Sequence, residues 1–228
     1  QFPEQLGHLS WLKRWYLRLV TRVGLKRAQQ VVAVSQYTRD QILRYHGSHF
    51  ENKLRVIYEG WEHLLFFANE TCGYPKDIPF SKYILYVGSS RGHKNWGRLI
   101  QAIQRASHQL PPDWGFVFIG STKMLSKKHL QLVQQLNRQR PIIQITGWQE
   151  DCSLASYYRH AQALIFPSLS EGFGIPILEA YFYRIPLLLS NQASLPEIAG
   201  DAAIYFDPYD VQDISDSILH FTKQSDHT

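Results

Sequence analysis

The stretch SLSEGFGIPILEA, residues 168–180, decides how this chain is interpreted. It places two glutamates, Glu171 and Glu179, eight positions apart around a Gly-Phe-Gly turn. Glu179 lies in the apolar run 175–182, where a buried carboxylate without a partner costs several kcal/mol or takes up a proton. Ribose hydroxyls or an ion pair with a lysine or arginine would each satisfy Glu179, and the residues alone leave both open. Glu171 precedes the turn, where its two oxygens suit sugar hydroxyls.

The turn itself favours a ligand site. Gly172 and Gly174 leave backbone N–H groups accessible because no Cβ blocks an approaching molecule. Pro176 is typical of the first turn of a helix, so we expect a helix over residues 176–183. The N-terminus of such a helix is favourable to an anion.

Eight short apolar or β-branched runs predict buried strands. They cover residues 31–34, 54–58, 83–87, 116–119, 142–145, 163–166, 186–189 and 203–206. Helical spacing lies between several of them, at 96–103, 154–161 and 211–218. Thr38 with Gln41 has the form of a capping box before a further short helix. From residue 83 onward this alternation predicts an α/β fold, a Rossmann-like parallel sheet sandwiched by helices.

A second loop follows the predicted strand 83–87 and reads GSSRGHKN. It brings Arg91, His93 and Lys94 to a glycine-containing turn before a helix, and that combination suits a diphosphate. Neither GxGxxG nor GxxxxGK[ST] is present, so a solvated turn with incidental cations stays open. After the run 142–145, Gly147 and Trp148 are candidates for a base-binding loop.

Composition restricts the partners. The net charge is +5 and the pI is about 9.1, which favours an anionic ligand or describes a mildly basic soluble enzyme. The two cysteines, Cys72 and Cys152, form no metal motif, and a reducing compartment is the simpler assumption. Scattered histidines give no metal-ligand pattern, and no basic–aromatic motif points to nucleic acid.

Residues 9–27 differ from the rest, since they combine six basic side chains with Trp11 and Trp15. Such a helix is either an ordinary surface helix or a peripheral contact with an anionic membrane surface. Together with the absence of a long apolar run or a signal peptide, this predicts a cytoplasmic protein that is either free or peripheral at the inner face of the membrane.

These segments together resemble the retaining GT-B glycosyltransferases of glycosyltransferase family 4, with the glycosyl transferases group 1 domain. The similarity covers about residues 28–222 and includes VVAVSQYTRDQIL, KLRVIYEGWE, YILYVGSSRGHKN and PLLLSNQASLPEIAGDAAIYFDPYD. Its most specific element is the pair of glutamates within PSxxEGFGxPxxEA. The subgroup that the chain resembles comprises mannosyl- and related transferases of polysaccharide or lipopolysaccharide assembly.

The resemblance implies a role for each candidate residue. Lys94 and Arg91 would hold the donor diphosphate, with His93 as the substitute for the arginine of the family's RKN. Glu171 would be the catalytic residue that binds the hydroxyls of the donor sugar, and Glu179 would bind the ribose. The remaining donor-binding residues would be Ser168, Gly172, Phe173 and Gly174 against sugar and phosphate, and Gly147 and Trp148 beside the base. No metal and no cofactor other than the nucleotide-sugar donor, UDP- or GDP-linked, is implied.

The implied activity is retaining transfer of a mannose- or glucose-type hexose to a glycan or lipid-linked acceptor. Residues 1–58 would be the end of an N-terminal acceptor domain with the crossover, and residues 59–228 the C-terminal nucleotide-sugar-binding domain. Because a GT-B enzyme needs two such domains, we expect a fragment that binds nucleotide diphosphate weakly and transfers sugar poorly. A nucleotide-sugar-binding module without catalysis is the alternative, and an epimerase or phosphorylase on the same fold is a further one.

Overall fold

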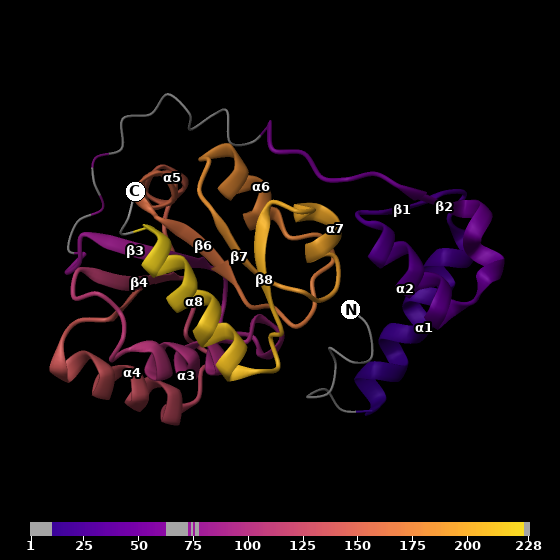
Figure 1. Ribbon diagram of the computed structural model, residues 1–228. Helices are drawn as coiled ribbons and strands as arrows, with labels where there is room; N and C mark the ends of the chain where they lie inside the picture. Colours follow the sequence, from indigo (N-terminus) through magenta and orange to yellow (C-terminus); the bar gives the residue numbers. More distant parts are fainter. Residues whose placement is uncertain (1–10, 63–72, 74, 76–77, 226–228) are drawn as a thin grey trace.

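The computed structural model describes residues 11–62, 73, 75 and 78–225. It contains a two-stranded and a six-stranded sheet, both parallel, which lie in separate parts of the molecule (Figure 1). All eight apolar runs of the sequence form strands. They are β1 (Val31–Ala33), β2 (Leu54–Val56), β3 (Lys82–Val87), β4 (Trp114–Ile119), β5 (Ile143–Gly147), β6 (Ala163–Phe166), β7 (Leu187–Ser190) and β8 (Ala203–Phe206).

The six-stranded sheet has the order β5-β4-β3-β6-β7-β8. Its central strands are buried on both faces, which is why they read as continuous apolar runs rather than as alternating ones. Residues Tyr83 to Tyr86 and Ala163 to Phe166 are completely shielded from solvent. In the register of β3 with β6, Ile84 faces Ala163 and Leu85 faces Leu164.

Helices cover both faces of this sheet. α3, α4 and α8 lie on one side, and α5 and α6 lie on the other (Figure 1). Their bounds are α3 (Trp96–Ala106), α4 (Lys127–Gln139), α5 (Asp151–His160), α6 (Ile175–Phe182), α7 (Leu195–Ala199) and α8 (Val211–Ser225). The helices expected at 96–103, 154–161, 176–183 and 211–218 correspond to α3, α5, α6 and α8. Neither α4 nor α7 was predicted from the sequence.

An aromatic cluster fastens α3 to the sheet. Trp96, the first residue of α3, packs edge-on against Phe118 with ring centroids 4.9 Å apart and against Tyr86 at 5.3 Å. Each such pair adds about 0.5–1.5 kcal/mol beyond the buried area. The N-terminus of α3 is therefore held at a fixed place beyond the carboxyl end of β3.

The two-stranded sheet belongs to the N-terminal part of the chain. Here α1 (Trp11–Arg27) and α2 (Gln36–His46) accompany β1 and β2, and a 3₁₀ helix spans Ser48–Lys53. Nothing in this arrangement tests the domain boundary predicted between residues 58 and 59, which stays a prediction. The loop expected at 69–81 lies mostly outside the described residues.

The expected capping box at Thr38 is wrong, because α2 begins three residues earlier than that box requires. Ser35, in an extended conformation, is the N-cap, and its hydroxyl accepts a hydrogen bond from the Thr38 N–H at 3.0 Å. The Thr38 hydroxyl is thereby left to bond elsewhere. Serine and threonine are both favoured N-caps, so the residue type alone does not decide between them.

Cys152, in the first turn of α5, is disulfide-bonded, which differs from the expectation of reduced cysteines. Spacing along a chain does not decide this, because a disulfide depends on the distance between residues in space. Cys72 lies outside the described residues.

α1 exposes a group of large apolar side chains. They are Trp11, Leu12, Trp15, Tyr16, Leu19, Val20 and Val23. Both interpretations of residues 9–27, a surface helix or a membrane contact, stay predictions. No helix within the described ranges has the length and apolar character needed to cross a membrane.

The loops after β3 and β4 pack backbone to backbone, and this packing can be tested at Gly120. Its φ is +145°, and a Cβ there would lie 1.9 Å from the Gly88 carbonyl oxygen. We expect Gly120→Ala to lower the free energy of unfolding by about 2–4 kcal/mol, measured by denaturant titration, because strain and overlap add. Gly92→Ala is the matched control, since a Cβ at Gly92 has open space around it. Equal stabilities for the two variants would contradict this packing.

Candidate donor-binding site

The candidate site lies where the direction of the sheet reverses. The chain passes from β3 to β4 and β5 on one side, and from β6 to β7 and β8 on the other. The loops that follow β3 and β6 therefore meet at the same edge, the usual place for a ligand in an open parallel sheet. A backbone hydrogen bond joins them, from the Leu169 N–H to the His93 carbonyl at 2.8 Å.

An ion pair stands between these two loops. The Lys94 Nζ lies 2.8 Å from the Glu171 Oε1, and the two side chains are only 18% and 14% exposed. The same ammonium lies 4.8 Å from the centre of the Phe166 ring, which adds a cation–π contact. The structure therefore brings together two predicted residues that are far apart in sequence, and it shields both from water.

Asn95 fixes the lysine loop. Its side-chain amide donates to the carbonyl oxygens of Pro167 at 3.1 Å and Pro208 at 2.8 Å, so it links the loops after β3, β6 and β8. Asn95 is also the N-cap of α3 in the left-handed conformation, with a φ of +60°. Few residues other than glycine adopt that conformation as readily as asparagine. A buried amide with these bonds makes the position of the neighbouring Lys94 reproducible.

The glycine turn is held by its carbonyl groups. The Ser194 hydroxyl is placed 3.1 Å from the Glu171 carbonyl and 2.8 Å from the Phe173 carbonyl. The Gly172 carbonyl accepts from the hydroxyls of Ser35, at 2.6 Å, and Thr38, at 2.9 Å. Three successive carbonyl oxygens are thereby bound by protein groups.

Gly174 is the N-cap of α6 and has a left-handed backbone conformation. Its φ is +112°, and a Cβ would meet the Leu195 and Ile177 side chains at 3.0 and 3.1 Å. A larger residue would therefore be strained in φ and crowded in space. Pro176 lies in the first turn of α6, as predicted.

Glu179, one turn into α6, is bound by a phenol. The Tyr158 hydroxyl, from α5, donates a hydrogen bond to the Glu179 Oε2. Tyr158 is completely buried, and burial raises the pKa of its phenol well above 10, with the Glu179 charge adding to the effect. This partner is neither of the two that the sequence suggested, and the proposed contact of Glu179 with ribose stays a prediction.

The other candidates are placed less closely together. Gly147 has a φ of +76°, and a Cβ placed there would have open space around it. Trp148, the next residue, is 77% exposed. Ser168 is fully buried, and no described residue hydrogen-bonds its hydroxyl. Arg91 is exposed and does not join the Lys94–Glu171 pair. Their roles toward the donor stay predictions.

Arg91 instead lines a separate cavity of about 420 Å³. This cavity lies between the starts of α3 and α4, and its polar lining includes Arg91, Arg98 and His129. Arg98 is engaged there by the Asn95 side-chain oxygen at 3.2 Å and by the Tyr209 ring at 5.5 Å. Neither Lys94 nor either predicted glutamate lines this cavity.

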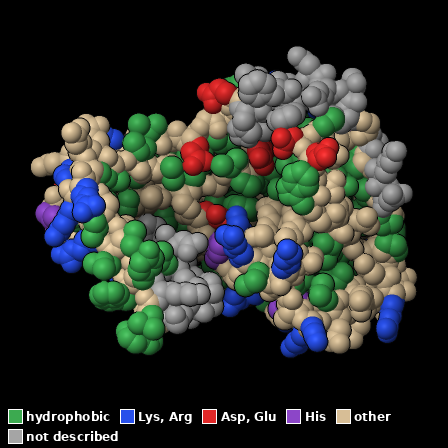
Figure 2. Space-filling model, turned by 180° about the vertical axis from the view of Figure 1, so that it is seen from behind, with side chains coloured by type: hydrophobic (Ala, Val, Ile, Leu, Met, Phe, Trp, Pro, Cys, Tyr) green, Lys and Arg blue, Asp and Glu red, His purple; other side chains and the backbone are tan. Residues whose placement is uncertain are grey.

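Charge is segregated on one face of the molecule. In Figure 2, most acidic side chains lie in the upper part of this face, and the basic side chains lie at the left edge, in the middle and along the lower edge.

Sequence reasoning missed the residues that support the site. Ser194 and Tyr158 carry no motif of their own, and they act through contacts between elements distant in sequence. Asn95 ends the GSSRGHKN loop, but no role was predicted for it. The detectable signal was the asparagine directly after Lys94 at the predicted start of a helix, since asparagine favours caps and left-handed turns.

The model of the family "Glycosyl transferases group 1" matches residues 77–228, more than half of the chain. The chain belongs to this family. The model "Glycosyltransferase Family 4" matches residues 4–63. The resemblance drawn from the sequence is therefore confirmed, and the domain boundary remains a prediction.

Two curated relatives are O-antigen enzymes. The chain is 36% identical over 142 residues to O-antigen chain mannosyltransferase B of Escherichia coli, which covers 62% of this chain and 37% of that protein. It is 26% identical over 220 residues to O-antigen chain mannosyltransferase RfbU of Salmonella typhimurium, which covers 95% of this chain and 58% of that protein. The chain thus spans well under two thirds of the length of these relatives.

Among solved structures, the fold resembles Anabaena Alr3699/HepE, which was determined in complex with UDP and glucose. The TM-score is 0.74 at 18% identity, with 97% of this chain and 60% of that chain covered. This likeness confirms the predicted fold class, a Rossmann-like α/β sheet of the GT-B type.

The buried Tyr158–Glu179 pair predicts a dependence of stability on alkaline pH. Because the folded state raises the pKa of the Tyr158 phenol, that phenol keeps its proton above pH 10 while the unfolded chain releases it. Stability is therefore fully present below pH 10 and falls above it, by about 1.4 kcal/mol per pH unit for this group. Denaturant titrations at several pH values above 10 should show that the free energy of unfolding falls less steeply with pH in Tyr158→Phe than in the wild type. Tyr209→Phe, which removes an exposed phenol, should keep the wild-type slope, and identical slopes for all three proteins would contradict the assignment.

Proposed function

We propose that this chain supplies the donor-binding half of a retaining hexosyltransferase of polysaccharide or lipopolysaccharide biosynthesis. The donor is a nucleotide-diphosphate sugar of the mannose or glucose type, and the acceptor is a glycan or a lipid-linked glycan. The observation that carries the proposal is the shielded Lys94–Glu171 pair at the switch point of the sheet. Family membership and the O-antigen mannosyltransferase relatives support it.

The diphosphate binds at the Lys94 ammonium. That group has three N–H donors, so it can contact a phosphate oxygen and keep its ion pair with Glu171. One lysine paired with a carboxylate leaves little net charge for a diphosphate. The N-termini of α3 and α6, which both begin at this edge, add N–H donors and positive dipole ends.

Glu171 and the glycine turn receive the sugar. A carboxylate held by Lys94 accepts hydrogen bonds from sugar hydroxyls with its remaining lone pairs. During transfer the bond between the anomeric carbon and the phosphate oxygen breaks, and its electron pair stays on that oxygen. The acceptor hydroxyl forms the new bond on the same face of the sugar, and its proton passes to the departing phosphate.

The positive groups stabilise the charge that develops on the leaving diphosphate. Such preorganised electrostatic stabilisation is worth several kcal/mol in enzymes. In this proposal Lys94 and the two helix N-termini supply it without a divalent cation. Transfer by the complete enzyme should therefore persist in EDTA. The rest of the donor is held by Glu179, which contacts the ribose, and by the Gly147–Trp148 loop, which contacts the base.

A nucleotide-sugar-binding module without catalysis is the second candidate. It is favoured by one observation, that Arg91, the second cation expected at the diphosphate, lies outside the Lys94–Glu171 pair and lines another cavity. In both cases the nucleotide sugar binds, so a transfer assay on the complete protein separates them, because only the first candidate then transfers the sugar.

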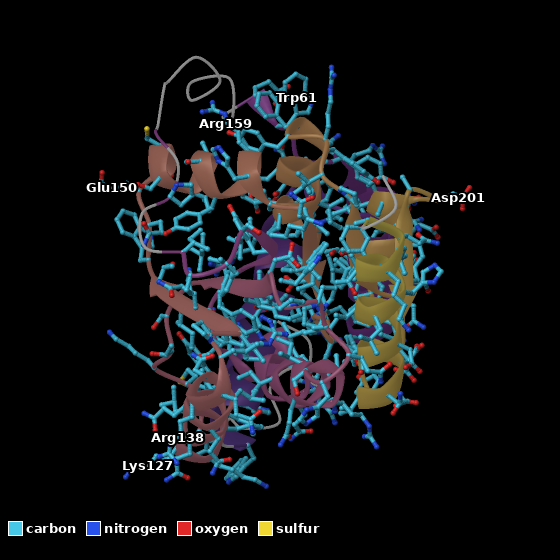
Figure 3. The ribbon with its side chains drawn as sticks, turned by 60° about the vertical axis from the view of Figure 1, so that its left-hand side comes forward. Trp61, Lys127, Arg138, Glu150, Arg159 and Asp201 are labelled. Carbon is cyan, nitrogen blue, oxygen red and sulfur yellow. The ribbon has the colours of Figure 1, made fainter. Side chains whose placement is uncertain are left out.

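Calorimetry on three variants tests the binding roles. Lys94→Ala should weaken UDP or GDP by about tenfold or more, because it removes a charged contact to phosphate. Lys127→Ala is the control, since this lysine lies at the start of α4 with the exposed basic side chains at the lower end of the view in Figure 3. Glu171→Gln should leave UDP and GDP affinity nearly unchanged and should weaken the corresponding nucleotide sugars.

Three results would contradict these roles. The first is nucleotide binding that survives Lys94→Ala unchanged. The second is equal weakening of nucleotide and nucleotide sugar by Glu171→Gln. The third is a wild-type chain that binds neither UDP nor GDP nor their sugar derivatives.

A further inference from the structure

Glu197, on α7, contacts the N-terminal part of the chain with both carboxylate oxygens. Its Oε1 accepts from the Gln36 N–H at 2.7 Å and from the Tyr58 hydroxyl at 2.8 Å. Its Oε2 accepts from the Tyr37 N–H at 2.9 Å. α7 is the helix of the six-stranded part that lies nearest to β1 and α2 in Figure 1.

These contacts complete the first turn of α2. The first N–H groups of a helix have no acceptor inside the helix. The Ser35 hydroxyl takes the Thr38 N–H, and Glu197 takes those of Gln36 and Tyr37. A carboxylate at this position also interacts favourably with the helix dipole. One side chain of the six-stranded part thus acts as the cap of a helix in the N-terminal part.

The same turn of α2 also contacts the glycine turn at residues 172–174. Ser35 and Thr38 donate to the Gly172 carbonyl, whereas Ser194 holds the carbonyls on either side of it. Ser194 belongs to the six-stranded part, three residues before Glu197. Of the three bound carbonyls in this turn, the middle one alone depends on where α2 lies.

Tyr58 provides a second line of contact. Its hydroxyl donates to Glu197, and its ring lies 6.0 Å from the ring of Phe173, which follows Gly172. The Glu197 carboxylate therefore orients two groups, the first turn of α2 and the Tyr58 side chain, that both contact residues 172–173.

We propose that Glu197 is a positioning residue for donor binding. It couples the conformation of the Gly172–Phe173 peptide to the placement of α2 against the six-stranded part. When the Glu197 bonds are made, the peptide is held with its carbonyl toward α2. When they are lost, this peptide is freed while Lys94 and the loops linked by Asn95 keep their own contacts. The effect on sugar recognition rests on the function proposed above, and the coupling itself does not.

Hydrogen exchange followed by mass spectrometry tests the coupling in the chain without ligand. In Glu197→Gln, we expect about tenfold faster exchange at the amides of Gln36 and Tyr37, because a charged acceptor is lost. Exchange should also rise in the segment 171–174. Asp201→Asn removes the same charge from an acidic side chain that projects into solvent just after α7, and it should exchange as the wild type does (Figure 3). Unchanged exchange at 171–174 in Glu197→Gln would overturn the proposal.

Calorimetry extends the test to the donor. Glu197→Gln should weaken binding of UDP-glucose or GDP-mannose about three- to tenfold and leave UDP or GDP affinity unchanged, since Lys94 is not disturbed. Thr38→Val, which removes one bond to the Gly172 carbonyl, should have a similar effect, and the double variant should be no weaker than Glu197→Gln alone. Fully additive effects, or an equal loss for nucleotide and nucleotide sugar, would overturn the positioning role.

Two further outcomes separate the possible failures. If the wild-type chain binds no nucleotide, the proposed function fails, and the exchange experiment still decides the coupling. If Glu197→Gln does not fold, Tyr58→Phe replaces it, because it removes one hydrogen bond and keeps the ring beside Phe173. Tyr58→Phe should increase exchange at 171–174, and an unchanged rate would contradict the proposal.

Discussion

The arrangement of the candidate site depends on one shielded ion pair, between the Lys94 ammonium and the Glu171 carboxylate. Taking both charges out of water is costly, and their attraction offsets this cost only when the geometry is good. That geometry comes from the surroundings. Asn95 holds the lysine loop to the loops after β6 and β8, and Ser194 holds the backbone of Glu171.

The sheet topology explains why these contacts occur together. β3 and β6 are neighbours in the sheet although 75 residues, 88–162, lie between the end of β3 and the start of β6. Their carboxyl ends therefore bring two loops side by side that the sequence presents far apart. The aromatic packing of Trp96 then fixes the start of α3 in the same region. Core packing and site geometry are thus parts of one arrangement.

The strands were predictable from the sequence, and much of the supporting network was not. A strand buried on both faces leaves a local signal, a short apolar run, and all eight runs became strands. The pairing of Glu179 with Tyr158 leaves no such signal, because it depends on how α5 packs beside α6. The cap of α2 was misplaced by three residues for a related reason, since Ser35 and Thr38 both suit the role and their tertiary partners decide between them.

Trp148 is the candidate residue whose side chain is most exposed among those measured at the site. Its side chain is 77% exposed, and it follows Gly147, where the backbone turns in open space. Exchanging this side chain alters the outer surface of the molecule and leaves its interior undisturbed. Residue 148 can therefore vary in evolution, or be randomised in a library, at little cost in stability, whereas Asn95, Ser194 and Tyr158 each make contacts that a substitution would break.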